Sequence, residues 1–163
     1  MEQAIEGVAL IRKQIPNLEL YLVGRIDFFA NRLKSVVKAK GYSDWVKFLG
    51  QVTDDELSGL YHNCQAYLFL SLQEGFGLGP LEAASNEALI IASDIPVLHE
   101  ILTDGAIFTD RKNTQQIAQA IISSFIPATK EKTMAAARQT LKRYSWPDTV
   151  NKTLKVYHET IVR

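Results

Sequence analysis

Two glutamates that flank a glycine-rich segment are the residues best placed to do chemistry in this chain of 163 residues. Glu74 precedes the segment and Glu82 follows it. The segment between them contains three glycines, Gly75, Gly77 and Gly79. Glycines let a ligand approach the backbone closely, and the first N–H groups of a helix lack partners and carry partial positive charge. Such a segment suits a sugar or a phosphate, although a plain tight turn uses the same residues.

The residues around the glycines predict a strand, a loop and a helix in that order. Residues 66–70 form a short apolar run that is rich in aromatic side chains, as in a buried strand. Pro80 stands where a first helical residue would be, and good helix formers follow it. The helix N-terminus would therefore lie at the carboxyl end of a strand, which is where open α/β sheets bind ligands.

The two carboxylates have different candidate roles at such a site. Glu82, in the first helical turn, is suited to accept hydrogen bonds from paired ribose hydroxyls while backbone N–H groups hold a diphosphate. Glu74, at the strand end, would face the ligand. Each has a plain alternative, because an acid in a first turn is stabilised by the helix dipole and an acid in a loop is solvated. The residues alone leave both alternatives open.

The segment and its continuation closely resemble the signature of the carboxyl-terminal domain of the retaining glycosyltransferases of family 4. These are the group 1 glycosyltransferases, which have the GT-B fold. The resemblance rests mainly on residues 74–83 and 90–100. Shorter matches in the family's order lie at residues 22–24, 46–52, 55–57 and 144–146, so that most of the chain is covered.

The resemblance implies a use for each residue of the segment. Glu82 would bind the ribose of the nucleotide. Glu74 would be the catalytic residue, lying beside the transferred sugar and stabilising positive charge at its anomeric carbon. Backbone groups that contact donor-sugar hydroxyls and phosphate oxygens would come from Gly75, Phe76, Gly77 and Leu78. A strand end near the nucleotide base would comprise Lys47, Phe48 and Leu49.

The resemblance also implies the substrates. The donor would be a UDP- or GDP-sugar, transfer of a hexosyl group would retain the anomeric configuration, and no metal or other cofactor would take part. A glycan, lipid-linked or protein acceptor would bind a separate amino-terminal half. We expect residues 1–163 to be a single nucleotide-sugar-binding domain that lacks this half, its own first strand, and the Arg and Lys that hold the diphosphate in the family. Alone it would transfer little sugar.

Alternating strands and helices predict a Rossmann-like three-layer α/β domain, with a parallel sheet and helices on both faces. Strands are expected at residues 18–23, 46–49, 66–70, 89–92 and 106–109. Helices are expected at residues 1–14, 31–40, 96–102, 113–125 and 130–144, and after the caps Thr53 and Ser145. An apolar face of the last helix would comprise Val150, Leu154, Val156, Tyr157 and Ile161.

Composition excludes several other classes of protein. Lysine plus arginine numbers 18 and aspartate plus glutamate numbers 18, so net charge gives no reason to expect nucleic acid or an anionic membrane as partner. No apolar run approaches the roughly 20 residues of a membrane span, and no signal-peptide pattern opens the chain. We expect a cytoplasmic protein, with peripheral membrane contact of the intact enzyme left open. Cys64, the single cysteine, excludes an internal disulfide and is expected to be buried.

Other motifs have structural explanations. Asp54 and Asp55 follow Thr53 and precede Glu56, which is the pattern of a capping box and accounts for the acidic pair without a metal. The GxGxxG and GK[ST] motifs are absent, and the three histidines lack zinc spacing. Arg25 follows a predicted strand, where a solvated arginine is favoured over a phosphate ligand.

Three further expectations concern single residues. The family has a helix-ending glycine where this chain has Glu87, and Asn86 is expected to supply the left-handed conformation in its place. Trp45 and Trp146 should be packing residues.

Two rival functions remain. The first is a non-catalytic module with this fold that binds a partner chain, which exposed apolar area on the first or last helix would support. The second is a sugar-nucleotide epimerase of the same family fold, which would keep the donor site and differ in product.

Overall fold

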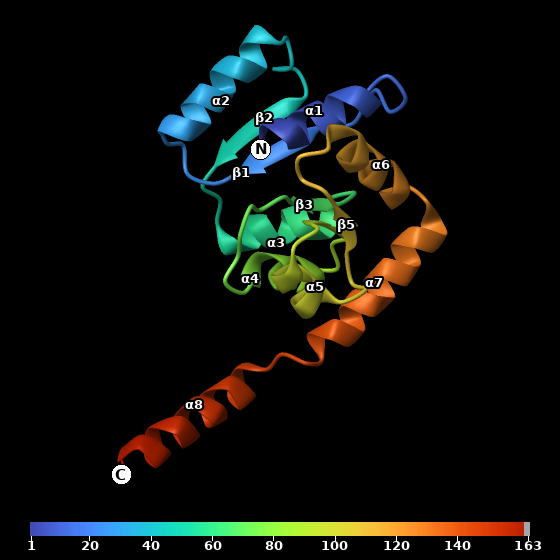
Figure 1. Cartoon of the computed structure of the whole chain (residues 1–163). Helices are drawn as coiled ribbons and strands as arrows, with labels where there is room; N and C mark the ends of the chain where they lie inside the picture. Colours follow the sequence, from blue (N-terminus) through green and yellow to red (C-terminus); the bar gives the residue numbers. More distant parts are fainter. Residues whose placement is uncertain (162–163) are drawn as a thin grey trace.

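The computed structural model describes residues 1–161, in which strands and helices alternate (Figure 1). The strands are β1 (Leu20–Val23), β2 (Val46–Gly50), β3 (Tyr67–Phe69), β4 (Ile90–Ser93) and β5 (Ile107–Thr109). The helices are α1 (Glu2–Ile11), α2 (Phe28–Ala39), α3 (Asp54–Asn63), α4 (Leu78–Ser85), α5 (Pro96–Leu102), α6 (Thr114–Ser124), α7 (Pro127–Leu141) and α8 (Trp146–Ile161).

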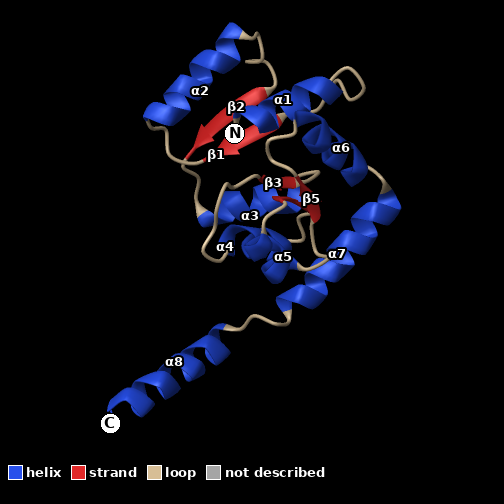
Figure 2. Cartoon of the chain, viewed as in Figure 1, coloured by secondary structure: helices blue, strands red, loops and turns tan. Residues whose placement is uncertain are grey.

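Every strand pairing is parallel, as predicted, but the strands form two sheets where one was expected (Figure 2). β1 pairs with β2, and the second sheet has the order β3-β4-β5. Within residues 1–161, β1 and β3 therefore each have one strand partner. The alternation of strands with helices predicts the direction of each strand, but the neighbour of a strand depends on contacts distant in sequence.

One buried cluster nevertheless joins the two sheets. Leu22 of β1 and Ile91 of β4 both belong to it, together with side chains of α1 and α6. The two helices approach closely because Gly7 has no side chain: a Cβ built there would lie 2.7 Å from Cγ2 of Ile117. Apolar residues at helical spacing, such as Ile5 and Val8, complete the contact. Helices thus cover one face of both sheets.

A second cluster covers the opposite face. All four residues of β4 are buried, and alternate side chains point to opposite faces of a strand. Ile91 faces the cluster of α1 and α6, whereas Ile90 and Ala92 pack against Leu81 of α4 and Leu98 of α5. The fold is therefore a Rossmann-like α/β arrangement with helices on both faces, as the sequence predicts.

α8 extends away from the rest of the protein in Figure 1 and buries none of its residues. Trp146 is 73% exposed, so its prediction as a packing residue is wrong, whereas Trp45 is buried as expected. The apolar face predicted for this helix, which includes Val150 and Leu154, is exposed. No helix among residues 1–161 combines the length and apolar character needed to cross a bilayer.

The end of α4 corrects another prediction. Asn86 has φ −95°, and the left-handed residue is Glu87, with φ 62°. Asn86 caps the helix, its N–H bonding the carbonyl of Glu82 at 3.2 Å, and the N–H of Ala88 bonds the carbonyl of Ala83 at 2.9 Å. The reversal of the chain therefore falls at Glu87, one residue later than predicted. Cys64 is half-buried rather than fully buried, and this burial raises the pKa of its thiol.

Candidate functional site

The glycine-rich loop begins at the carboxyl end of β3, and β4 holds its first residues in place. The hydroxyl of Ser93 donates a hydrogen bond to the carbonyl of Ser71 at 2.7 Å. The hydroxyl of Ser71 in turn donates to the carbonyl of Gln73 at 3.1 Å. Ser93 is buried, so the loop is fixed at its base just before Glu74.

Gly77 forms the junction between the loop and α4. Its φ of 105° and ψ of 55° lie in the left-handed region that favours glycine. A Cβ built on Gly77 would lie 3.1 Å from Cδ2 of Leu98, so a larger residue would also crowd α5. α4 begins at Leu78, earlier than the predicted start at Pro80, and no side chain caps it. Glu82 therefore lies in the second turn of α4, and its prediction in the first turn is wrong. The N–H groups of its first turn have no partner within the helix and are oriented to bind an anion or a hydroxyl oxygen.

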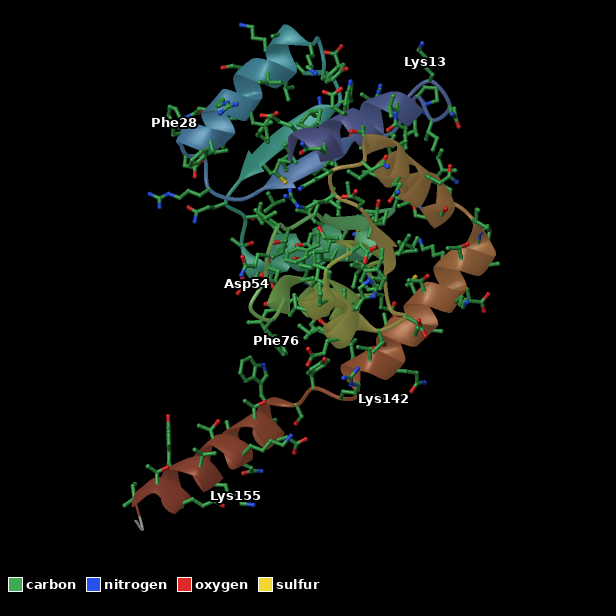
Figure 3. All side chains as sticks on the ribbon, in the orientation of Figure 1. Lys13, Phe28, Asp54, Phe76, Lys142 and Lys155 are labelled. Carbon is green, nitrogen blue, oxygen red and sulfur yellow. The ribbon has the colours of Figure 1, made fainter. Side chains whose placement is uncertain are left out.

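An aromatic contact supports the loop from the other side. The ring of Phe76 meets the ring of Tyr144 edge to face, with centroids 5.7 Å apart and planes at 90°. The hydroxyl of Tyr144 donates to the carbonyl of Ile101 at 3.2 Å. Figure 3 shows Phe76 on the side of the protein that faces the connection after Lys142, which leads to α8. The family match at residues 144–146 did not predict this contact, because Phe76 and Tyr144 are almost 70 residues apart.

The structure brings Glu74 and Glu82 into one region. Glu82 is exposed on α4, and Glu74 is half-buried in the loop. The pKa of Tyr67, on β3, is raised first by burial, then by the neighbouring Tyr61 and by the negative charges of Glu82 and Glu74. Both carboxylates therefore lie within electrostatic reach of one phenol. Sequence analysis missed Tyr67, whose position beneath α4 depends on the fold.

The residues predicted near a nucleotide base lie on β2, in the other sheet. Phe48 is half-buried, with the ammonium of Lys34 5.5 Å from its ring centre, and Leu49 is exposed. The ammonium of Lys47 donates to the carbonyl of Asp44 at 2.7 Å. Since Asp44 precedes β2, this bond holds the Lys47 charge on the amino side of the strand, away from the carboxyl edge.

A cavity of about 430 Å³ opens at the carboxyl end of β1. Its lining includes Gly24, Arg25, Phe29, Leu33 and Phe48, but no residue from Glu74 to Glu82. The cavity and the two acidic residues thus indicate two different candidate sites. We base the candidate site on the loop, because the two carboxylates and the unpaired N–H groups lie there, whereas the cavity is mainly apolar.

One histidine pairs with an acid outside the loop. Nε2 of His99 lies 2.7 Å from Oδ1 of Asp94, and the His99 ring stacks on Phe108 at 3.7 Å between centroids. No group of three or more His, Cys, Asp or Glu side chains with metal-binding proximity occurs in the part of the chain that the structure describes.

Comparison with known proteins places this geometry in a family. The profile described as "Glycosyl transferases group 1" matches residues 1–140. The O-antigen chain mannosyltransferase RfbU of Salmonella typhimurium is 37% identical over 112 residues, which cover 63% of this chain and 31% of that protein. The GDP-mannose:cellobiosyl-diphosphopolyprenol alpha-mannosyltransferase of Xanthomonas oryzae pv. oryzae is 25% identical over 165 residues, covering 96% of this chain and 43% of that protein. The chain thus spans less than half the length of either relative.

A solved structure supports the same fold. Anabaena Alr3699/HepE, solved in complex with UDP and glucose, superposes with a TM-score of 0.80 at 22% identity, covering 98% of this chain and 44% of that chain. At this identity the likeness concerns the fold alone. The family match extends over most of the chain, from α1 through almost all of α7. The chain belongs to the group 1 glycosyltransferases and has the Rossmann-like fold of one half of a GT-B enzyme.

Proposed function

We propose that this chain is the donor-binding part of a retaining glycosyltransferase, which takes a hexosyl group from a nucleotide-diphosphate sugar. The observation that carries the proposal is the loop that ends in α4. Glu74 precedes the uncapped N-terminus of α4, and Glu82 follows it in the second turn of the helix. An acid for the nucleotide, N–H groups for the diphosphate and an acid for the sugar would thereby lie within the length of one donor.

Each group would have a separate task. Glu82 would accept hydrogen bonds from the ribose hydroxyls, since an exposed carboxylate at this position is open to a ligand. Glu74 would orient the transferred sugar and stabilise the positive charge that develops at its anomeric carbon. Backbone N–H groups would contact sugar hydroxyls and phosphate oxygens from Gly75, Phe76, Gly77 and Leu78. Departure of the diphosphate would be eased by these N–H groups rather than by a metal.

Two relatives named as mannosyltransferases make GDP-mannose the first donor to test, and UDP-glucose is the alternative to set beside it. The acceptor, a glycan, a lipid-linked glycan or a protein, would be held by polypeptide outside this chain, which spans less than half of those relatives. Retention is testable in a protein that carries both parts: NMR of the product should show the anomeric configuration of the donor.

Nucleotide binding tests the donor site directly. GDP or UDP titrated into the chain should shift the backbone amide signals of Gly77 and Leu78 in an NMR spectrum. Replacing Glu82 by Ala should weaken binding about tenfold, since a hydrogen bond to a charged group is lost. Glu131→Ala, at an exposed glutamate of α7, is the matched control and should bind as the unchanged chain does. A folded chain whose spectrum is unaffected by millimolar nucleotide would contradict the proposal.

A second candidate, a module that binds a partner chain without catalysis, is favoured by one observation. The apolar face of α8 is exposed over Val150, Leu154, Tyr157 and Ile161. This candidate predicts that nucleotide shifts no amide signals in either the unchanged chain or Glu82→Ala. The titration above therefore distinguishes the two.

A further inference from the structure

We propose that Tyr67 and Gly79 are a matched pair that sets the position of the first turn of α4, which makes Tyr67 a positioning residue for the glycine-rich loop. The consequence for a bound nucleotide rests on the proposed function, whereas the consequence for the backbone does not. Tyr67 would act through the helix that lies on it.

The contact is between a hydroxyl and a backbone. A Cβ built on Gly79 would lie 3.3 Å from Oη of Tyr67 and 3.7 Å from Cε2 of Phe69. A separation of 3.3 Å between a carbon and this oxygen is tighter than ordinary van der Waals contact. Gly79 has no positive φ that would demand glycine. A side chain at residue 79 would therefore require the phenol or the first turn of α4 to shift by a few tenths of an ångström.

Tyr67 is held so that it cannot easily give way. Its ring meets the ring of Tyr61, on α3, edge to face, with centroids 5.0 Å apart and planes at 77°. On the other side its ring centre lies 6.0 Å from that of Phe69. Tyr61 is 7% exposed and belongs to the buried cluster under α4. Since packed interiors resist small displacements, the phenol acts as a fixed support.

The hydroxyl of Tyr67 also suits the charge distribution around the first turn of α4. Burial is the main cause of the raised pKa of Tyr67, and the charges of Glu82 and Glu74 add to it. The phenol is therefore neutral at neutral pH. A neutral support adds no third negative charge next to two carboxylates, at a helix end whose N–H groups would receive an anion.

The support determines where the loop amides lie. Gly77 and Leu78 directly precede Gly79 and form the start of α4. If a methyl group at Gly79 lifts this turn from Tyr67, both amides move with it. Displacements far below the size of an atom are enough to weaken a preorganised contact. Glycine at residue 79 and tyrosine at residue 67 should therefore be energetically coupled.

A double-mutant cycle tests the coupling. We expect Gly79→Ala to shift the backbone amide signals of Gly77 and Leu78 and to weaken GDP or UDP binding about three- to thirtyfold. Tyr67→Phe removes the oxygen that the methyl group meets, so the double variant Tyr67→Phe, Gly79→Ala should return both readouts toward those of the unchanged chain. Gly59→Ala is the control, because a Cβ on this glycine of α3 meets nothing within 4 Å.

Additive effects of the two substitutions, or unchanged amide signals in Gly79→Ala, would overturn the proposal. If Gly79→Ala does not fold, Tyr67→Phe alone still decides, since loss of the support should shift the same two amides and an unaltered spectrum would contradict it. If Gly79→Ala only lowered the stability of the fold in general, the added Tyr67→Phe substitution would not restore the amide signals or nucleotide binding. If the unchanged chain binds no nucleotide, the proposed function fails while the amide signals still test the pair.

Discussion

At the scale of single residues, Glu56 offers a direct test of the cap of α3. Its carboxylate accepts a hydrogen bond from the N–H of Thr53 at 2.8 Å, and the N–H of Glu56 bonds the Thr53 hydroxyl at 3.3 Å. The bonds from the Thr53 N–H and hydroxyl lower the pKa of Glu56 from its ordinary value of 4.5. A carboxyl whose pKa is lower in the folded state stabilises the fold above its unfolded pKa and loses this contribution as the pH falls through its folded pKa.

Glu56→Gln should therefore lower the urea midpoint near neutral pH. The difference from the unchanged chain should shrink as the pH falls below 4.5 and disappear once Glu56 is protonated in the folded state. Glutamine keeps an oxygen for the capping box but removes the charge. Urea unfolding followed by circular dichroism over this pH range measures both midpoints. Glu131→Gln, at an exposed glutamate of α7, is the control. A difference that stays constant as the solution is acidified through and well below pH 4.5 would show that the charge of Glu56 is not involved.

Residue types and close spacing predicted the Thr53 cap, because all of its bonds lie within four residues. The same reasoning failed at Asn86, where the choice of left-handed residue depends on how the chain leaves α4. It also could not find Tyr67, whose significance comes from Gly79, twelve positions later and on another element. Candidate site residues on one loop were thus predictable, and the residues that support the loop were not.

At the scale of elements, the close approach of α7 to the end of α5 depends on Gly105. A Cβ built on Gly105 would lie 2.8 Å from Cα of Ala137, on α7, and 2.9 Å from the carbonyl oxygen of Leu102. Both are backbone atoms, so no side chain can move aside. Gly105→Ala should separate the two elements and destabilise the fold by about 1–3 kcal/mol, the usual cost of overpacking.

Urea unfolding of Gly105→Ala beside Gly59→Ala measures this contact. Gly59 lies in α3 with nothing within 4 Å of a Cβ, and alanine there should stabilise the chain by a few tenths to about 1 kcal/mol, since alanine is the better helix former. Opposite signs for the two variants are expected. If Gly105→Ala is as stable as the unchanged chain, α7 can move away from α5 without cost.

Patterns of neighbouring residues predicted where the helices and strands lie better than they predicted which strands pair. α5 lies where Pro96 and the following apolar residues place it. α2 begins at Phe28, earlier than expected, because Asp27 caps it by accepting the N–H of Ala30 at 2.9 Å. The division into two sheets was not predictable, because no pattern within β1 or β3 states which strand lies beside it. Strand pairing is decided by the whole chain.

At the scale of the whole molecule, α8 is set apart from the two buried clusters. It contributes no residue to either cluster and buries none of its own. Isolated helices of this length are marginal in water, because most helical stability in proteins comes from packing of an apolar face. The contacts of residues 1–145 should therefore determine the stability of the chain.

A chain that ends at Ser145 should unfold with a free energy within about 0.5 kcal/mol of the full chain, as expected for the loss of surface residues. Backbone amides of α8 should exchange with solvent far faster than those of α6, whose residues Ile117 and Ile121 are buried. Urea unfolding and hydrogen exchange of the full and shortened chains measure the two effects. Slow exchange in α8, dependent on protein concentration, would mean that its apolar face packs against a second copy. A lower urea midpoint for the shortened chain at every concentration would mean that α8 packs against residues 1–145 in solution.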